Sequence, residues 1–275
     1  MNYRTFYAAV VALLTVMQVF GGDFASEIIQ ATFKFQNPGC TATCFLMRRD
    51  EPDKAMYLVT AGHVFESTKG ETAMLVLREL QTDGTYIRRE HKVSIRLGET
   101  PLWTRHSKED VAALRLAEPL PVAVRPLPLS DLADEERLLA EGLHTCSPIF
   151  VLTYPRQFEA NDWGFPVTRQ GIISSHPFLP TQPNHRYLAD FTTFPGDSGA
   201  PVFVTTKDGH PLIIGINIAE FRHDEKVSME YQELTIQHPF GLGIVLYPQI
   251  IRETIENASQ QHTRTVEMER AKSEQ

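Results

Sequence analysis

The stretch Pro195-Gly196-Asp197-Ser198-Gly199-Ala200-Pro201 is followed at once by the apolar run Val202-Phe203-Val204. A serine in a glycine-containing turn just before a strand contributes little to core packing. It suits a nucleophile, because backbone N–H groups in such a turn can meet the negative charge of a tetrahedral intermediate. A serine hydroxyl alone is a weak nucleophile, so a histidine base and an acid that orients the base are expected elsewhere in the chain.

Two apolar runs upstream carry the side chains that such a nucleophile needs. His63 directly follows the run that opens at Met56, and Asp110 directly precedes the run that ends at Leu116. Each residue alone has an ordinary explanation, such as a helix-cap histidine or a strand-entry acid. Together they predict a triad of Ser198 as nucleophile, His63 as general base and Asp110 as the orienting acid. The N–H groups of Gly196 and Ser198 are the predicted oxyanion hole.

These motifs resemble those of the trypsin-like serine peptidases. That family has Thr-Ala-x-His, Asp-(Ile/Val)-Ala-x-(Leu/Val) and Gly-Asp-Ser-Gly in the order in which this chain carries them. The resemblance implies a chymotrypsin fold and hydrolysis of peptide bonds through an acyl-enzyme. Within the family, Gly171-Ile172-Ile173-Ser174 and Gly215-Ile216-Asn217 look most like the bacterial HtrA-type proteases, without their PDZ module.

Short β-runs between turn signals follow one another from Ile28 onward, which predicts an all-β fold. Six runs precede a proline-rich segment and six follow it, so we expect two six-stranded antiparallel β-barrels and a short C-terminal helix. The peptidase domain is predicted over 28–258, with an N-terminal barrel at about 28–118, a linker at 119–141, a C-terminal barrel at about 142–248, a helix at 249–258 and a polar tail at 259–275. The site is expected in the cleft between the two barrels.

The N-terminal segment carries a targeting signal. One early charge, Arg4, is followed by an apolar block that ends at Phe20, before Gly21-Gly22. This pattern predicts a secretory signal peptide over residues 1–21, with a single membrane anchor as the less favoured alternative. No other stretch is long and apolar enough to span a membrane. We therefore expect a secreted or periplasmic protein.

Composition narrows the choice of partners. The net charge is −8 and no basic cluster is present, which argues against nucleic acid as the main partner. Metal and nucleotide motifs are absent, so no cofactor is expected. The expected partner is a polypeptide substrate, and the sequence leaves the oligomeric state open.

The resemblance also suggests a substrate pocket. Trypsin has an aspartate six residues before the nucleophile, and Thr192 stands there in this chain, followed by Thr193, with Asn217 near the wall of the pocket. An uncharged floor implies that the substrate residue before the scissile bond is small, apolar or uncharged polar. The chain has no Ile-Val-Gly-Gly motif, so Asp197 is expected to cap local N–H groups or to pair within the chain.

Several other residues are given ordinary structural roles. Cys40, Cys44 and Cys146 are expected to be buried thiols, because in an extended strand the first two lie ~13 Å apart, too far for a disulfide without a turn. A disulfide from Cys146 to one of them stays open. His106 is expected in a solvated loop, and the run from His223 to Glu225 in a charged loop.

Two alternatives to an active peptidase remain. One is a protease-fold binding or scaffold protein with a latent or closed site. The other is a processing factor that acts only within an assembly and docks through the tail from Ser259. Labelling of Ser198 by a fluorophosphonate probe separates the three hypotheses.

Overall fold

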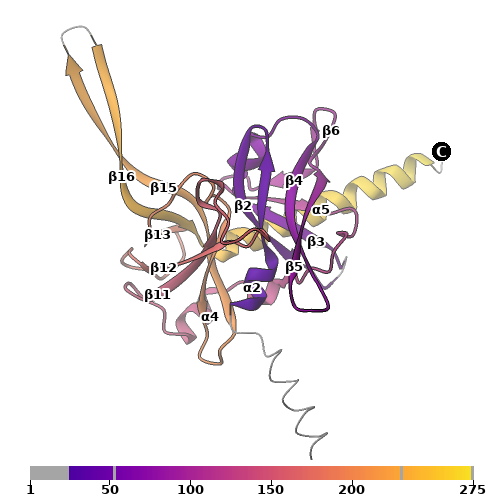
Figure 1. The fold of residues 1–275 in the computed structure, drawn as a ribbon, viewed down its shortest axis with the longest axis horizontal. Coiled ribbons are helices and arrows are strands. Elements are labelled where there is room, and N and C mark those ends of the chain that lie inside the picture. The colour runs from indigo at the N-terminus through magenta and orange to yellow at the C-terminus, as the bar shows by residue number, and fades with distance from the viewer. Residues whose placement is uncertain (1–24, 52–53, 230–231, 274–275) are drawn as a thin grey trace, which may run out of the picture.

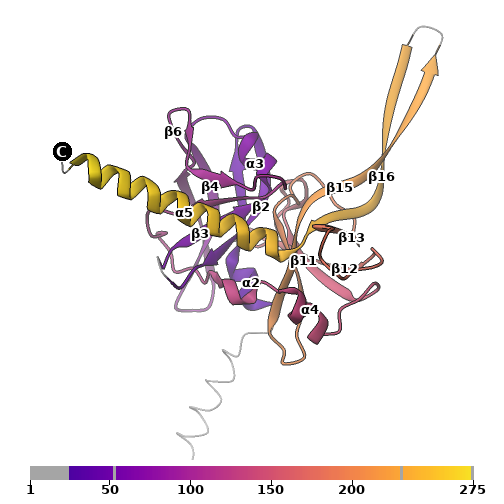
Figure 2. The same cartoon turned by 180° about the vertical axis from the view of Figure 1, so that it is seen from behind.

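The structure, a computed structural model, describes residues 25–51, 54–229 and 232–273, so the predicted signal peptide lies outside the described residues. Two β lobes lie side by side, and a long C-terminal helix starts at the second lobe and runs across the first (Figures 1 and 2). None of the helices in the described ranges is long and apolar enough to cross a membrane.

The N-terminal lobe is a barrel-like sheet of eight strands in the order β5-β4-β1-β2-β3-β9-β8, with β10 parallel to β2. The short helix α3 (Gly62–Glu66) follows β3, and α2 (Ser26–Ala31) precedes β1. The strands of the lobe are β1 (Thr32–Asn37), β2 (Cys40–Arg48), β3 (Met56–Thr60), β4 (Thr72–Leu80), β5 (Tyr86–Ser94), β8 (Trp103–Arg105), β9 (Ala112–Arg115) and β10 (Leu127–Pro128), with β6 (Arg96–Leu97) and β7 (Thr100–Pro101) as a separate pair.

The C-terminal lobe is a closed barrel of six strands in the order β11-β12-β13-β16-β15-β14. Its strands are β11 (Pro148–Thr153), β12 (Val167–Ile173), β13 (Arg186–Asp190), β14 (Ala200–Thr205), β15 (Pro211–Met229) and β16 (Gln232–Leu246), with the 3-10 turn η2 (Pro155–Gln157) after β11. The linker contains η1 (Leu129–Asp131) and α4 (Glu135–Ala140). Asp134 caps α4 by accepting a hydrogen bond from the Arg137 N–H at 2.8 Å.

The predicted all-β fold of two lobes is confirmed. The N-terminal sheet has eight strands where six were expected, because two short segments add to it. Trp103–Arg105 pairs with β9, and Leu127–Pro128, which the proline content assigned to a linker, pairs with β2. A proline at the edge of a sheet loses no hydrogen bond to a neighbouring strand, so a strand there is compatible with proline. The proline content alone therefore did not reveal the strand at Leu127–Pro128.

The C-terminal helix α5 (Pro248–Ser273) is much longer than the predicted helix at 249–258. Ile250, Ile251 and Ile255 are buried in the core of the N-terminal lobe, and this contact stabilises the first half. The segment predicted as a polar tail continues the helix, because strong helix formers occupy it and no glycine or proline interrupts it.

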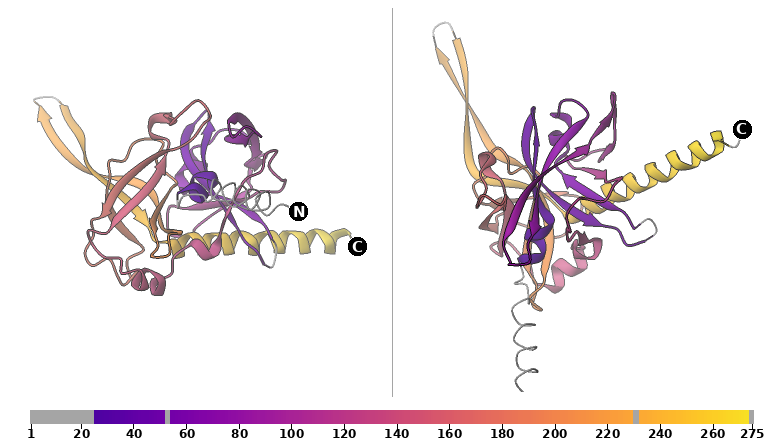
Figure 3. Two further views of the ribbon diagram at one scale, coloured as in Figure 1. Left: turned by 60° about the horizontal axis from the view of Figure 1, so that its bottom comes forward. Right: turned by 45° about the vertical axis from the view of Figure 1, so that its right-hand side comes forward.

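The hairpin β15–β16 extends far beyond the barrel as a two-stranded ribbon (Figures 1 and 3). We call its outer part, residues 221–229 of β15 and 232–240 of β16, the arm. His223, Asp224 and Glu225 lie in β15 and pair with residues of β16. The prediction of a charged loop at this position is therefore wrong.

A buried cation holds the two lobes together. The Arg78 guanidinium in β4 donates to the Tyr154 hydroxyl and to the Gly164 carbonyl of the second lobe, both at 3.1 Å. It also donates to the carbonyls of Ile29 and Thr32 at 2.8 Å. These four hydrogen bonds offset the cost of burying the charge and tie the lobes in one arrangement, while Arg78 Nε has no hydrogen-bond partner in the described residues. The cleft between them is positioned by both cores.

Candidate active site

His63 lies at the start of α3, immediately after the buried strand β3. Its backbone N–H donates to Asp110 Oδ1 at 2.8 Å, and its Nδ1 lies 2.6 Å from Asp110 Oδ2. The preceding Gly62 leaves room for this approach, since a Cβ there would lie 2.9 Å from Asp110 Oδ1. The two contacts fix both the ring orientation and the tautomer, with the proton on Nδ1.

The Asp110 carboxylate is half-buried in front of β9. Burial opposes its ionisation, but the hydrogen bonds and charge of His63, together with the charge of Arg105, outweigh burial and hold the pKa of Asp110 below its usual value. Arg105 Nη2 lies 3.6 Å from Asp110 Oδ1, and Arg105 Nε pairs with Glu66 at 3.0 Å. The carboxylate is therefore ionised in the neutral pH range.

The loop before Asp110 is built around His106, which is 6% exposed. Its Nδ1 accepts the N–H groups of Lys108 at 3.3 Å and Glu109 at 3.0 Å, so the ring proton is on Nε2, which faces Glu253 of α5 at 3.2 Å. The predicted solvated position of His106 is therefore wrong. Sequence alone missed this positioning residue, because its partner Glu253 is far away along the chain.

Ser198 lies on the turn that leads into β14. Its Oγ is 3.1 Å from His63 Nε2 and 3.4 Å from the carbonyl oxygen of Ile218 in β15. Thus the three side chains that the sequence singled out come together across the cleft, two from the first lobe and one from the second. The arrangement allows a proton to pass from Ser198 Oγ to His63 Nε2 while Asp110 faces the developing charge.

Both lobes hold the backbone of the turn at 196–198. Thr43 of β2 donates its hydroxyl to the Gly196 carbonyl at 2.8 Å, and its N–H donates to the Ser198 carbonyl at 3.0 Å. Gly196 has φ +103, and a Cβ there would lie 2.3 Å from the Tyr154 carbonyl oxygen, so this position requires glycine. Among the described residues, neither the Gly196 N–H nor the Ser198 N–H donates to a protein acceptor. Two free donors therefore remain beside the Ser198 hydroxyl.

Asp197 also holds the turn at 196–198 in place. Its fully buried carboxylate forms an ion pair with Arg169 of β12 and accepts the Phe194 N–H at 2.8 Å. The Arg169 guanidinium also donates to the Thr192 carbonyl. Burial raises the pKa of Asp197 despite the opposing effect of Arg169. The prediction that Asp197 caps local N–H groups or pairs within the chain is confirmed, and Arg169 is a partner that the motifs did not reveal.

The predicted pocket residues lie on both sides of this turn and differ in burial. Thr192 is exposed, whereas Thr193 and Asn217 are buried. Asn217 Nδ2 donates to the Asp197 carbonyl at 3.3 Å, while its Oδ1 has no hydrogen-bond partner in the described part of the chain. Glu220, farther along β15, pairs with Arg222 at 2.8 Å. The carboxylate nearest to this pocket on β15 is therefore already neutralised.

All three cysteines lie in the described residues and none forms a disulfide. Cys44 is buried and Cys40 half-buried, as expected, but Cys146 is exposed. Burial raises the pKa of Cys40 to about 11, so this thiol stays protonated at neutral pH. None of the three touches the cluster around Ser198.

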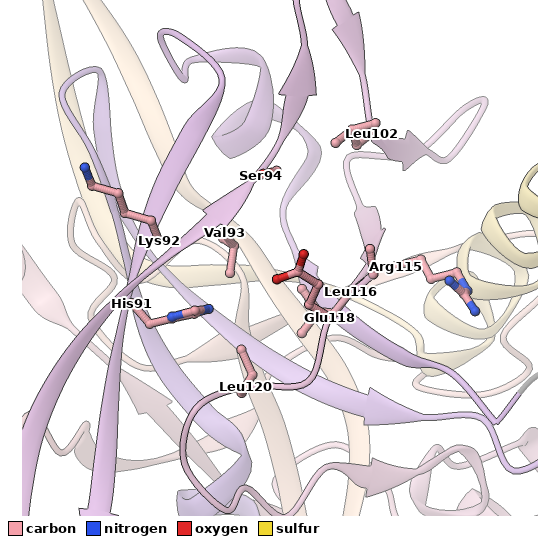
Figure 4. Close-up of a pocket in the computed structure, with 10 residues that line it drawn as sticks. His91, Lys92, Val93, Ser94, Leu102, Arg115, Leu116, Glu118 and Leu120 are labelled. Carbon is pink, nitrogen blue, oxygen red and sulfur yellow. The ribbon is translucent and has the colours of Figure 1, made fainter.

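A groove of about 140 Å³ lies elsewhere on the N-terminal lobe, and none of His63, Asp110 or Ser198 lines it. The side chains of His91, Glu118 and Leu120 point into it (Figure 4). It lacks a nucleophile held by a base. The chemistry that the sequence predicts therefore belongs to the open cleft and not to this groove.

Comparison with known proteins agrees with the geometry of the cleft. A family model described as "trypsin-like peptidase domain" matches residues 42–216. No curated protein matches the chain significantly. A solved structure of Rv3671c from M. tuberculosis H37Rv, a serine-to-alanine mutant in an inactive form, is similar at 15% sequence identity and a TM-score of 0.48, over 88% of this chain and 93% of that one. At that similarity, the structure says nothing of this chain's chemistry, and the predicted closeness to the HtrA-type branch stays a prediction.

Proposed function

Because this chain belongs to the trypsin-like peptidase family, we propose that it is a serine endopeptidase that uses Ser198, His63 and Asp110. Ser198 Oγ attacks the carbonyl carbon of the scissile bond while His63 Nε2 takes the hydroxyl proton. His63 then gives that proton to the leaving amine, and an acyl-enzyme on Ser198 remains. Water, deprotonated by the same ring, releases the acyl group and restores the serine.

Two contacts in series carry the proposal. Asp110 Oδ2 lies 2.6 Å from His63 Nδ1, and His63 Nε2 lies 3.1 Å from Ser198 Oγ. The depressed pKa of Asp110 supports its role, because an ionised carboxylate stabilises the protonated ring during the reaction.

We assign stabilisation of the oxyanion to the N–H groups of Gly196 and Ser198. Their lack of protein acceptors among the described residues supports this assignment, since a donor without a protein partner is available to the substrate oxygen. Each donor of this kind contributes about 3 kcal/mol to stabilisation of the transition state. Arg169 and Asp197 act as positioning residues for the turn.

The substrate residue before the scissile bond is proposed to be small, apolar or uncharged polar. Thr192, Thr193 and Asn217 carry no charge, and Arg222 neutralises Glu220. None of these residues offers a free carboxylate to a cationic side chain, and desolvating such a side chain without a partner is costly. The proposed location is secreted or periplasmic and rests on the signal pattern in residues 1–21 alone.

Hydrolysis of a peptide library by the purified protein tests the proposal. Mass spectrometry should find new termini after small, apolar or uncharged polar residues. Ser198→Ala should lower kcat by about 10⁶-fold, and the control Ser94→Ala, at an exposed serine, should match the wild type. Equal cleavage by Ser198→Ala and the wild type would reject the proposed nucleophile. Cleavage confined to sites after Arg or Lys would reject the proposed pocket.

A further inference from the structure

The strand β15 changes partners at the nucleophile. From Pro211 to Asn217 it pairs with β14, and from Ile216 onward it pairs with β16, so only Ile216 and Asn217 pair on both sides; Ala200 faces Asn217 as the last pair on the β14 side. Beyond Asn217, β15 pairs only with β16 in the described residues. Its other edge is therefore unpaired from Ile218 to Met229, and it begins where the Ile218 carbonyl lies 3.4 Å from Ser198 Oγ.

An unpaired strand edge is a template for an extended chain. Here the free edge continues the row that β14 occupies, so a strand added to it would end at Ser198. The direction of that strand follows from the chemistry. The leaving amine must face His63, which belongs to the N-terminal lobe, so the residues before the scissile bond extend away from that lobe. Figure 1 shows that the arm leaves the C-terminal barrel on this far side.

The arm also has the surface of a binding site rather than of a solvated hairpin. Directly paired residues share a face, so Val227, Met229, Leu234 and Ile236 lie together on one face, which we call the apolar face. Glu225, Gln232, His223 and His238 also belong to this face. Phe240 adds to that face, with its ring 6.1 Å from the His223 ring. Met229, Leu234, Ile236 and Phe240 are 37–57% exposed. A two-stranded ribbon alone is marginally stable in water, which favours a third strand beside it.

Resting on the proposed peptidase function, we propose that the arm lengthens the substrate site: the free edge of β15 from Phe221 to Met229 binds, as an added antiparallel strand, the substrate residues four or more positions before the scissile bond. A substrate residue k positions before the scissile bond then lies near position 217 + k of β15. The enzyme thus favours extended segments with about ten residues before the cleaved bond. Every second side chain of such a segment lies over the apolar face of the arm.

Peptides of graded length test this inference. They share the residues around one cleaved bond and carry three, six or ten residues before it. In the wild type, kcat/KM should rise about tenfold from six to ten residues, because the four added residues bring up to four backbone hydrogen bonds that each contribute about twofold at an exposed edge. In a variant with residues 224–237 replaced by Asn-Gly, which joins the paired positions His223 and His238 by a two-residue turn, that ratio should fall to about one.

The measured quantity is the ratio of kcat/KM between two peptides within one variant. A variant with lower overall activity can therefore still be compared with the wild type. Labelling of Ser198 by a fluorophosphonate probe verifies that the shortened variant is folded. A control variant that lacks residues 264–275, which lie outside the arm, should keep the tenfold ratio. In an N-methyl scan of the ten-residue peptide, only alternate positions should lose activity in the wild type, since alternate amides of a strand face β15.

The outcomes separate the two claims. Cleavage of all lengths at equal rates would overturn the arm as a substrate site and leave the peptidase standing. A dimer in sedimentation velocity that the arm deletion abolishes, with no change in the length ratio, would assign the arm to a second copy and overturn this inference. Absence of both cleavage and Ser198 labelling would reject the proposed function, and the inference with it.

Discussion

The two ends of the hairpin β15–β16 have the same backbone pairing and opposite surroundings. At the barrel end every residue from Pro211 to Ile218 is buried, and the strand pairs with β14 up to Asn217 and with β16 from Ile216 onward. In the arm the same strand pairs on one side, and both faces contact solvent. The comparison shows that one hairpin combines a buried end beside Ser198 with an exposed end in which β15 has one unpaired edge among the described residues.

The difference predicts where the molecule tolerates change. At the barrel end, both cores and the turn at 196–198 determine the position of every atom, so a substitution disturbs several partners at once. In the arm, each position has only its cross-strand neighbours. Stability should therefore respond strongly at the barrel end and weakly in the arm.

The largest loss is expected for Arg169→Met, beside the barrel end. This variant leaves the buried Asp197 carboxylate without its cation and should lower the free energy of unfolding by about 3 kcal/mol. Because burial already raises the pKa of Asp197, removing Arg169 raises it further, so the loss should be larger at pH 8 than at pH 5. Urea denaturation at both pH values measures it. An equal loss at both would show that Asp197 does not titrate with folding.

Gly215→Ala, in the middle of the barrel end, is expected to cost about 2 kcal/mol. A Cβ at this position would lie 2.5 Å from the Leu246 carbonyl oxygen, so the barrel must shift to accept it. Thermal unfolding measures the loss. A melting temperature equal to that of the wild type would mean that the barrel end is as tolerant as the arm.

Asp131→Asn, in the linker, should stabilise the protein. Burial, together with the nearby Glu27, raises the pKa of Asp131 to about 6. A raised folded-state pKa favours folding below the ordinary value, and that contribution is lost as the pH rises through about 6. The variant should therefore gain about 1 kcal/mol at pH 7.5 and nothing at pH 4, measured by urea denaturation against the exposed control Asp208→Asn. A gain that persists at pH 4 would contradict this explanation.

The smallest effect is expected in the arm, for Leu234→Ser. Its side chain is 43% exposed, so the free energy of unfolding should change by less than about 0.5 kcal/mol. Because both substitutions lie in the same hairpin, this change in the free energy of unfolding can be compared directly with that of Gly215→Ala. A loss above 2 kcal/mol would show that the arm is packed against something, which a measurement of oligomeric state would then identify.

Sequence alone predicted the buried end of this hairpin and missed the arm. The run from Leu212 to Ala219 contains one polar side chain, Asn217, and is otherwise apolar or glycine, which is the signature of a strand buried on both faces. In the arm, Arg222 to Lys226 are five consecutive charged or imidazole side chains, and the histidine and acids at 223–225 suggested a loop. A strand that pairs with a single neighbouring strand and is exposed on both faces leaves no strong pattern in the amino-acid sequence.

The residues of the candidate site also divide into those that the sequence predicted and those that it missed. Short motifs predicted His63, Asp110 and Ser198, because such chemistry needs those residue types in a strict local setting. The residues that position them, Arg169 and His106, act through partners distant in the sequence. Such contacts are visible only when the fold brings the segments together.

The most direct test of the account is the rate at which a fluorophosphonate probe labels Ser198, followed by intact-protein and peptide mass spectrometry. The account predicts a single adduct on Ser198 in the wild type and its loss in Ser198→Ala and His63→Ala, with Ser94→Ala labelled like the wild type. An adduct that forms equally fast in His63→Ala, or a folded wild-type protein that remains unlabelled, would contradict the claim that the cleft activates this serine.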